Sequence, residues 1–172
     1  ADWFTVYFTD PNDPNAGRYR GGPDTALASA IDSARLSVDM AIFDLNLWSI
    51  RDSLLEAARR GVEVRIVTET DNLDEPEIQE LIEAGIPVTD DRQENLMHHK
   101  FTIIDQYELW TGSMNYSTTE AYLNNNNLLR LRSSQAAKIY TAEFEEMFTD
   151  YLFGPDISPA TSDTDFTIEG TR

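Results

Sequence analysis

Both histidines of this 172-residue chain lie next to each other, and one of its two lysines follows them directly. The stretch MHHKFTIID, residues 97–105, has the β-branched and apolar composition of a strand. Alternate residues of a strand share a face, so we expect His98 and Lys100 on one face and His99 on the other, packing or hydrogen-bonding there. An imidazole that attacks or carries a proton near neutral pH, beside a fixed cation, suits phosphoryl chemistry.

A second strand-like run, YELWTGSMN, carries polar residues where it ends. Ser113 and Asn115 share a face and follow Gly112, which allows a close approach of the backbone to a ligand. A hydroxyl and a carboxamide there can bind phosphoryl oxygens. The same residues are also favoured in an ordinary turn at the end of a strand, so this segment alone is weak evidence.

Together the two runs spell HxK(x)4D(x)6GSxN, with Asp105 as the aspartate. This pattern resembles the HKD motif of the phospholipase D superfamily. The resemblance covers residues 3–153, including RRGVEVRIV before the motif and YTAEFEEMF after it. It implies an α/β fold of the phospholipase D type, an α-β-α sandwich with a central mixed sheet flanked by helices. It also implies a phosphodiesterase that uses a phosphohistidine and no metal or other cofactor.

The resemblance assigns a role to each motif residue. His98 is implied as nucleophile or general acid/base, and Lys100, Ser113 and Asn115 as ligands of the phosphate. Asp105 is placed with the catalytic set, more as a support than as a contact to the substrate, and Gly112 supports the site. Asn126 stands where superfamily members often have a glutamate that orients the histidine. An amide can hydrogen-bond to an imidazole, but it does not stabilise an imidazolium as a carboxylate does.

Only one HKD motif is present, whereas the chemistry implied by the family uses two. We therefore expect either a homodimer with both motifs at a two-fold interface or a second HKD domain in a longer chain. Symmetric dimers are the commonest assemblies, which favours the homodimer.

The net charge of the chain is −18. Such an acidic surface repels phosphate backbones at long range. An anionic substrate then needs a local basic patch. Candidates are Arg130 and Arg132, which alternate on one face of a predicted strand, and Arg18 and Arg20 in a glycine-flanked loop. Surface arginines that offset nearby acids would look the same. The chain has no cysteine, which excludes disulfides and cysteine-based zinc sites.

Strand and helix patterns alternate along residues 1–154, which we expect to form one domain. Residues 155–172 are rich in Ser, Thr, Asp and Pro and are typical of a linker or a disordered tail. No apolar run is long enough to cross a membrane, so we expect a soluble protein. The chain begins at Ala1, so secretion after removal of a signal peptide stays open and the location is unknown.

The leading functional hypothesis is an endonuclease on DNA or RNA, because compact single-motif members of the superfamily are often nucleases. A hydrolase of phospholipid or another small phosphodiester is the enzymatic alternative. The third hypothesis is a half-module without activity of its own. An exposed aromatic rim around the site would favour lipid, and a basic groove would favour nucleic acid.

Overall fold

Seven strands form one mixed sheet in the computed structural model, which describes residues 3–92 and 96–154. Their order across the sheet is β1-β7-β6-β5-β2-β3-β4. Strands β2, β3 and β4 run parallel, and all other neighbours are antiparallel. The strands are β1 (Phe4–Phe8), β2 (Ser37–Ile42), β3 (Glu63–Thr68), β4 (Val88–Asp90), β5 (Lys100–Ile104), β6 (Glu108–Gly112) and β7 (Asn127–Arg132).

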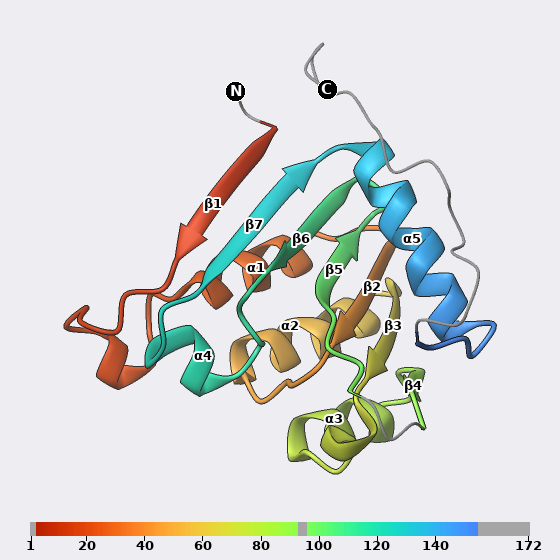
Figure 1. The fold of residues 1–172 in the computed structure, drawn as a ribbon, viewed down its shortest axis with the longest axis horizontal. Coiled ribbons are helices and arrows are strands. Elements are labelled where there is room, and N and C mark those ends of the chain that lie inside the picture. The colour runs from red at the N-terminus through yellow and green to blue at the C-terminus, as the bar shows by residue number, and fades with distance from the viewer. Residues whose placement is uncertain (1–2, 93–95, 155–172) are drawn as a thin grey trace.

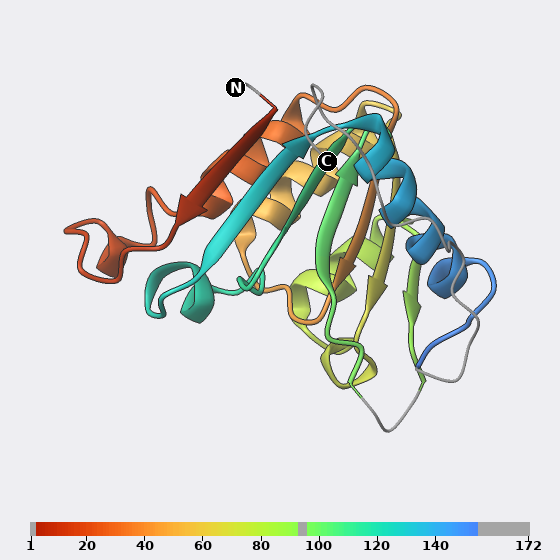
Figure 2. The ribbon, with the colours of Figure 1, turned by 45° about the horizontal axis from the view of Figure 1, so that its top comes forward.

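Helices cover both faces of this sheet, which confirms the predicted α-β-α sandwich (Figures 1 and 2). Helices α1 (Pro23–Asp32), α2 (Trp48–Arg59) and α3 (Pro76–Glu83) lie on one face, and α5 (Ser134–Phe148) lies on the other. Every residue of β2 is buried. Met40 packs in the core beneath α1 and α2, whereas Ala41 faces α5. Burial on both faces explains why this central strand is apolar without a clear alternation.

The structure also contains a short helix, α4 (Thr118–Tyr122). It follows β6 and ends before β7, at the lower end of the sheet in Figure 1. The carboxyl ends of β1, β2, β3 and β6 and the amino ends of β5 and β7 lie at this same end. We call it the site end, because the motif residues gather there.

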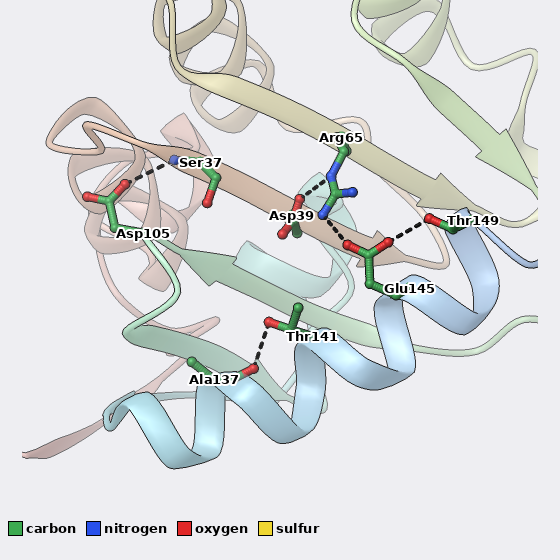
Figure 3. Close-up of polar contacts among 8 residues, drawn as sticks. All are labelled: Ser37, Asp39, Arg65, Asp105, Ala137, Thr141, Glu145 and Thr149. Atoms are coloured by element: carbon green, nitrogen blue, oxygen red, sulfur yellow. Dashed lines mark hydrogen bonds and ion pairs between the residues drawn. The ribbon is translucent and has the colours of Figure 1, made fainter. Parts of the chain in front are cut away.

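A partly buried ion-pair network ties α5 to the sheet (Figure 3). Arg65 on β3 donates to Asp39 on β2 and to Glu145 on α5, each at 2.7 Å. The Arg65 guanidinium also lies 5.0 Å from the centre of the Phe144 ring. Burial raises the pKa of Asp39, and the bond from Arg65 opposes that rise. A buried carboxylate of this kind needs such a cation to remain charged.

The described part of the chain bears on two further expectations. Within residues 3–92 and 96–154, no helix is long and apolar enough to cross a membrane. The tail expected at residues 155–172 lies outside the described residues.

Candidate active site

His98 and Lys100 lie together at the site end, where they share a contact with Phe43. The His98 ring is 4.9 Å from the Phe43 ring between centroids, edge on, and Lys100 Nζ is 5.3 Å from the same ring centre. Lys100 Nζ also donates to the backbone oxygen of His98 at 3.1 Å. Strand β5 begins at Lys100, so His98 precedes the strand instead of lying in it. The shared aromatic neighbour nevertheless places imidazole and ammonium on the same side.

His99 turns to the opposite face, as the alternation predicted. Its Nε2 is 3.4 Å from Glu143 Oε1 on α5, and its ring contacts Phe101 at 5.5 Å between centroids. Phe101 in turn packs edge on against Tyr140 of α5. The two adjacent histidines therefore have different surroundings, and only His98 lies beside Lys100.

The electrostatic environment favours a neutral His98 imidazole. Burial lowers the pKa of His98, and the charge of Lys100 lowers it further. Burial also lowers the pKa of Lys100, against the opposing charges of Glu120 and Asp44. An imidazole must be neutral to attack, because only then does one of its nitrogens have a free lone pair, and the charged Lys100 ammonium favours this neutral form.

The end of β6 brings the GSxN residues to the same place. Gly112 is required by packing, since a Cβ there would lie 2.4 Å from the backbone oxygen of Asn127 on β7. The glycine thus permits a close approach of β6 and β7. Ser113 is exposed, and its Oγ donates to Asn126 Oδ1 at 2.8 Å. Asn115 Oδ1 is buried and has no hydrogen-bond partner within the described residues.

Glu120 and Asp44 are functional candidates that the sequence reasoning missed. The Asn126 side-chain nitrogen donates to Glu120 Oε2 at 2.5 Å, so a carboxylate from α4 lies beside the amide that replaces the expected glutamate. Burial raises the pKa of Asp44, whose Oδ1 lacks a hydrogen-bond partner in the part of the chain that the structure describes. Glu120 precedes Asn126, the position that lacks the expected glutamate, by six residues. This proximity was the available sequence signal for Glu120. Nothing in the sequence pointed to Asp44.

Asp105 was placed with the catalytic set as a support, and the structure locates it away from His98 and Lys100. It follows the last residue of β5, about 17 Å along the strand from Lys100 at 3.4 Å per residue. Its carboxylate accepts backbone N–H groups of Arg35, Leu36 and Ser37, with Oδ1 distances of 3.0, 2.7 and 3.1 Å. Figure 3 shows the bond from Ser37. Asp105 therefore anchors the start of β2 to the β5–β6 hairpin.

Arg130 and Arg132 do not form the expected phosphate-binding patch either. Glu108 at the start of β6 accepts from Arg130 Nη2 at 2.5 Å and lies 3.7 Å from Arg132 Nε. Glu108 is at the opposite end of β6 from Gly112. The charges of both arginines are therefore directed toward an acid remote from His98, as the alternative interpretation held.

Comparisons with known proteins place the chain in a family. The family model described as "Cardiolipin synthase, PLD-like domain" matches residues 27–148. Human mitochondrial cardiolipin hydrolase is 34% identical over 136 residues, covering 75% of this chain and 54% of that protein. A phospholipase D of Rickettsia bellii is 31% identical over 116 residues, covering 66% of this chain and 58% of that protein. The chain belongs to the phospholipase D superfamily, and it spans little more than half the length of these relatives.

Solved structures agree on the fold. Nuc from Salmonella typhimurium, a phospholipase D family member, superposes with a TM-score of 0.71 at 24% identity, covering 83% of this chain and 91% of that one. NucT from Helicobacter pylori gives a TM-score of 0.64 at 20% identity, covering 84% and 95%. These likenesses establish the phospholipase D-type architecture.

Proposed function

We propose that this protein hydrolyses phosphodiesters at the His98 and Lys100 site and that phospholipids are its substrate class. The observation that carries the choice of lipid is a groove that His98 lines together with apolar side chains and with Asp91, His99 and Glu143. The groove has a volume of about 230 Å³, and its apolar lining consists of Leu96, Met97, Met147, Leu152 and Phe153. Leu96 and Leu152 are both exposed at its rim. Exposed apolar side chains next to a phosphoryl site suit an amphiphilic substrate.

In the proposed reaction, the neutral His98 imidazole attacks phosphorus, forming a P–N bond as the P–O bond to the leaving alcohol breaks. Lys100 neutralises charge on the non-bridging oxygens, and the side chains of Ser113 and Asn115 bind them. A second imidazole protonates the leaving oxygen. It then takes a proton from water, whose oxygen attacks phosphorus and releases His98.

A second copy of the chain supplies that second imidazole in the proposed assembly. Phe4, Val6 and Phe8, which we call the β1 strip, alternate along the edge strand, and all three are exposed. Phe4 lies in register with Leu131 of β7, which is on the sheet face that α5 covers. The contacts of α5 are mainly with β2, β3, β5 and β6 rather than with β1. The strip therefore extends the apolar sheet face beyond the helix, and a symmetric partner can cover it.

The β1 strip also leads to the site. Phe8 is followed by Thr9, whose hydroxyl oxygen accepts from Asn126 N at 2.6 Å. Asn126 in turn accepts from Ser113. A two-fold axis near Phe8 would thus bring two GSxN segments, and with them two His98 side chains, toward each other.

The second candidate function is the endonuclease, favoured by Arg18 and Arg20. Both are exposed in the loop between β1 and α1. They could serve as the local basic patch that a nucleic-acid backbone needs. We rank this function second because the acids nearest Lys100, Glu120 and Asp44, oppose a polyanion.

Hydrolysis assays with a metal chelator present test both functions. The substrates are phospholipid vesicles, single-stranded DNA and RNA, and the variants are wild type and His98→Ala. We expect lipid hydrolysis that His98→Ala abolishes. Cleavage of DNA or RNA alone would establish the second function. A monomer that is inactive on every substrate would identify a half-module, and activity in His98→Ala would reject the site.

A further inference from the structure

Large apolar side chains are exposed around the reacting groups at the site end. They come from the loop between β1 and α1, the start of α2, the segment before β5, the end of α4 and the segment after α5. These elements lie in the lower half of Figure 1. We call the set the apolar ring, and its six members are between 41% and 69% exposed: Tyr19, Trp48, Leu96, Leu123, Tyr151 and Leu152. Exposed apolar groups gathered at one end of a domain mark a surface that meets an apolar partner.

Tyr19, Trp48 and Leu123 form one side of the apolar ring. Tyr19 and Trp48 line one pocket together with Tyr122. Leu123 follows Tyr122 in the chain. The Trp48 indole N–H donates to Glu77 Oε1 at 2.9 Å, and Tyr19 meets the Tyr122 ring edge on, with 5.7 Å between centroids. The two aromatic side chains are therefore exposed and yet held in place.

Leu96, Tyr151 and Leu152 form the other side of the ring, with the reacting groups in between. Leu96 and Leu152 line the groove that also contains His98. On the first side, the loop that leads to Trp48 starts at Phe43, which contacts His98 and Lys100. A surface that meets both sides of the ring therefore meets the reacting groups as well.

The arrangement of apolar and polar groups in this surface is the reverse of that in a protein–protein interface. Such an interface has an apolar centre and a polar rim. Here the polar groups His98 and Lys100 lie in the centre and the apolar side chains lie around them. A lipid bilayer suits this arrangement, because it deforms around separate apolar side chains and offers polar headgroups to the centre.

Exposed arginines accompany the tyrosines of the ring. Arg18 and Arg20 flank Tyr19 in the chain, and the Arg92 guanidinium carbon lies 5.7 Å from the centre of the Tyr151 ring. Tyrosine, tryptophan and arginine are side chains that settle at the headgroup level of a bilayer, with their polar tips in water. The whole chain has a net charge of −18, which opposes an anionic membrane at long range. The ring therefore fits a zwitterionic bilayer, whose phosphate groups can pair with the arginines.

We propose that the apolar ring docks on the surface of a zwitterionic phospholipid bilayer, with Tyr19, Trp48 and Tyr151 at the headgroup level and the reacting groups facing the lipid. The docking itself requires no hydrolysis, whereas its use in presenting a substrate rests on the proposed function. Each ring side chain leaves water when it enters the interface, so the six contributions add up to a reversible association.

Co-sedimentation of the whole chain with phosphatidylcholine vesicles tests the docking. We expect wild type and His98→Ala to bind equally, because binding requires no turnover. Trp48→Ala and Leu152→Ala change one side chain on each side of the ring. They should lower the partition coefficient about tenfold and about threefold, because less apolar area enters the interface. An equal amount of phosphatidylglycerol in the vesicles should weaken the binding at low salt.

The far end of the sheet offers matched controls. Leu36 is 68% exposed just before β2, and Tyr107 is 52% exposed in the β5–β6 hairpin. Leu36→Ala and Tyr107→Ala should therefore leave vesicle binding unchanged. Fluorescence reports the orientation, because Trp110 is buried whereas Trp48 is exposed. Brominated phosphatidylcholine should quench the emission of the bound protein, and Trp48→Phe should remove most of this quenching while the protein still binds.

Several results would overturn the docking. They are no binding to phosphatidylcholine vesicles, binding unaffected by both Trp48→Ala and Leu152→Ala, an equal loss in Leu36→Ala, and tighter binding to vesicles with phosphatidylglycerol. Release of the protein from vesicles by single-stranded DNA would also overturn it and would assign the arginines of the ring to nucleic acid.

Failure of the docking and failure of the proposed function give different results. A chain that binds vesicles but hydrolyses no phospholipid would reject the proposed function and leave the docking established. Hydrolysis of a water-soluble, short-chain phosphatidylcholine by a chain that does not bind vesicles would reject the docking and leave the proposed function established.

Discussion

Asn126 and Glu120 form a hydrogen bond of 2.5 Å that brings a carboxylate to the site end from a helix outside the HKD motif. Asn126 also accepts from Ser113 at 2.8 Å, so Glu120, Asn126 and Ser113 form one connected chain. The charge of Glu120 reaches Lys100 as well, where it opposes the lowering of the lysine pKa. We infer that Glu120 supplies the negative charge that an amide at position 126 cannot.

Glu120→Gln should therefore slow the reaction while the fold is retained. We expect kcat/KM on bis(p-nitrophenyl) phosphate to fall about 10- to 100-fold, the usual range when a carboxylate that supports reacting groups is lost. Adding Asn126→Glu to this variant should restore part of the rate, because the charge returns to the same place. Glu143→Gln is the matched control, since Glu143 bonds to His99 on the other face. Unchanged activity in Glu120→Gln would refute the inference.

The pKa of His98 can be read directly, because the chain has only two histidines. Burial and Lys100 lower this pKa from its usual 6.5, so the imidazole should lose its proton below that pH. A nucleophilic His98 then gives a rate that falls as the pH drops through the lowered pKa. NMR titration of the imidazole protons, assigned with His99→Gln, measures the midpoint.

Lys100→Gln provides the internal comparison for this titration. It removes the neighbouring charge but leaves the burial, so the His98 pKa should rise yet stay below 6.5. A His98 midpoint above 6.5 in the wild type would contradict the electrostatic account of the site.

The sequence was sufficient for the architecture and for the pairing of His98 with Lys100, because strand periodicity and motif spacing are local properties. It was insufficient where a partner comes from a distant segment. Glu108 on β6 lies in register with Arg132 on β7. Because the pairing of these two strands sets this register, the sequence alone could not show that Arg130 and Arg132 form ion pairs with Glu108. Glu120 was missed for a different reason, since a five-residue helix has too little periodicity to be recognised.

Asp105 illustrates a different limit. In the strand predicted for residues 97–105, Asp105 already lies five residues from Lys100, too far to act on the same phosphate. The resemblance to the motif nevertheless placed it with the catalytic set. In this structure Asp105 accepts three backbone N–H groups and has a left-handed φ of 53°. The motif therefore mixes residues for chemistry with a residue for the hairpin.

Asp105→Asn should reduce stability more than activity. Asparagine tolerates the left-handed backbone, so the substitution isolates the loss of the carboxylate charge that holds the N–H groups of Leu36 and Ser37. We expect the free energy of unfolding to fall by about 2 kcal/mol, as for hydrogen bonds to a charged acceptor. Urea denaturation measures this, and kcat of the folded variant should stay close to wild type. A large loss of kcat at unchanged stability would return Asp105 to the catalytic group.

Salt should promote activity if the site is completed by a second copy. Two chains of charge −18 repel each other, and the Debye length falls from about 10 Å at 0.1 M salt to about 3 Å at 1 M. The apolar contact across the β1 strip, by contrast, does not weaken with salt. The sedimentation coefficient and the rate of bis(p-nitrophenyl) phosphate hydrolysis should therefore rise together as sodium chloride is added.

Val6→Lys and Phe8→Lys should each prevent both rises, because a charge placed in the apolar contact cannot be solvated there. Both side chains are exposed in the single chain, Phe8 by 75%, so monomer stability should change little. Tyr107→Lys, a similar change at the far end of the sheet, should behave like wild type. Full activity of a monomeric Phe8→Lys protein would show that the second imidazole does not come from a partner held by this surface.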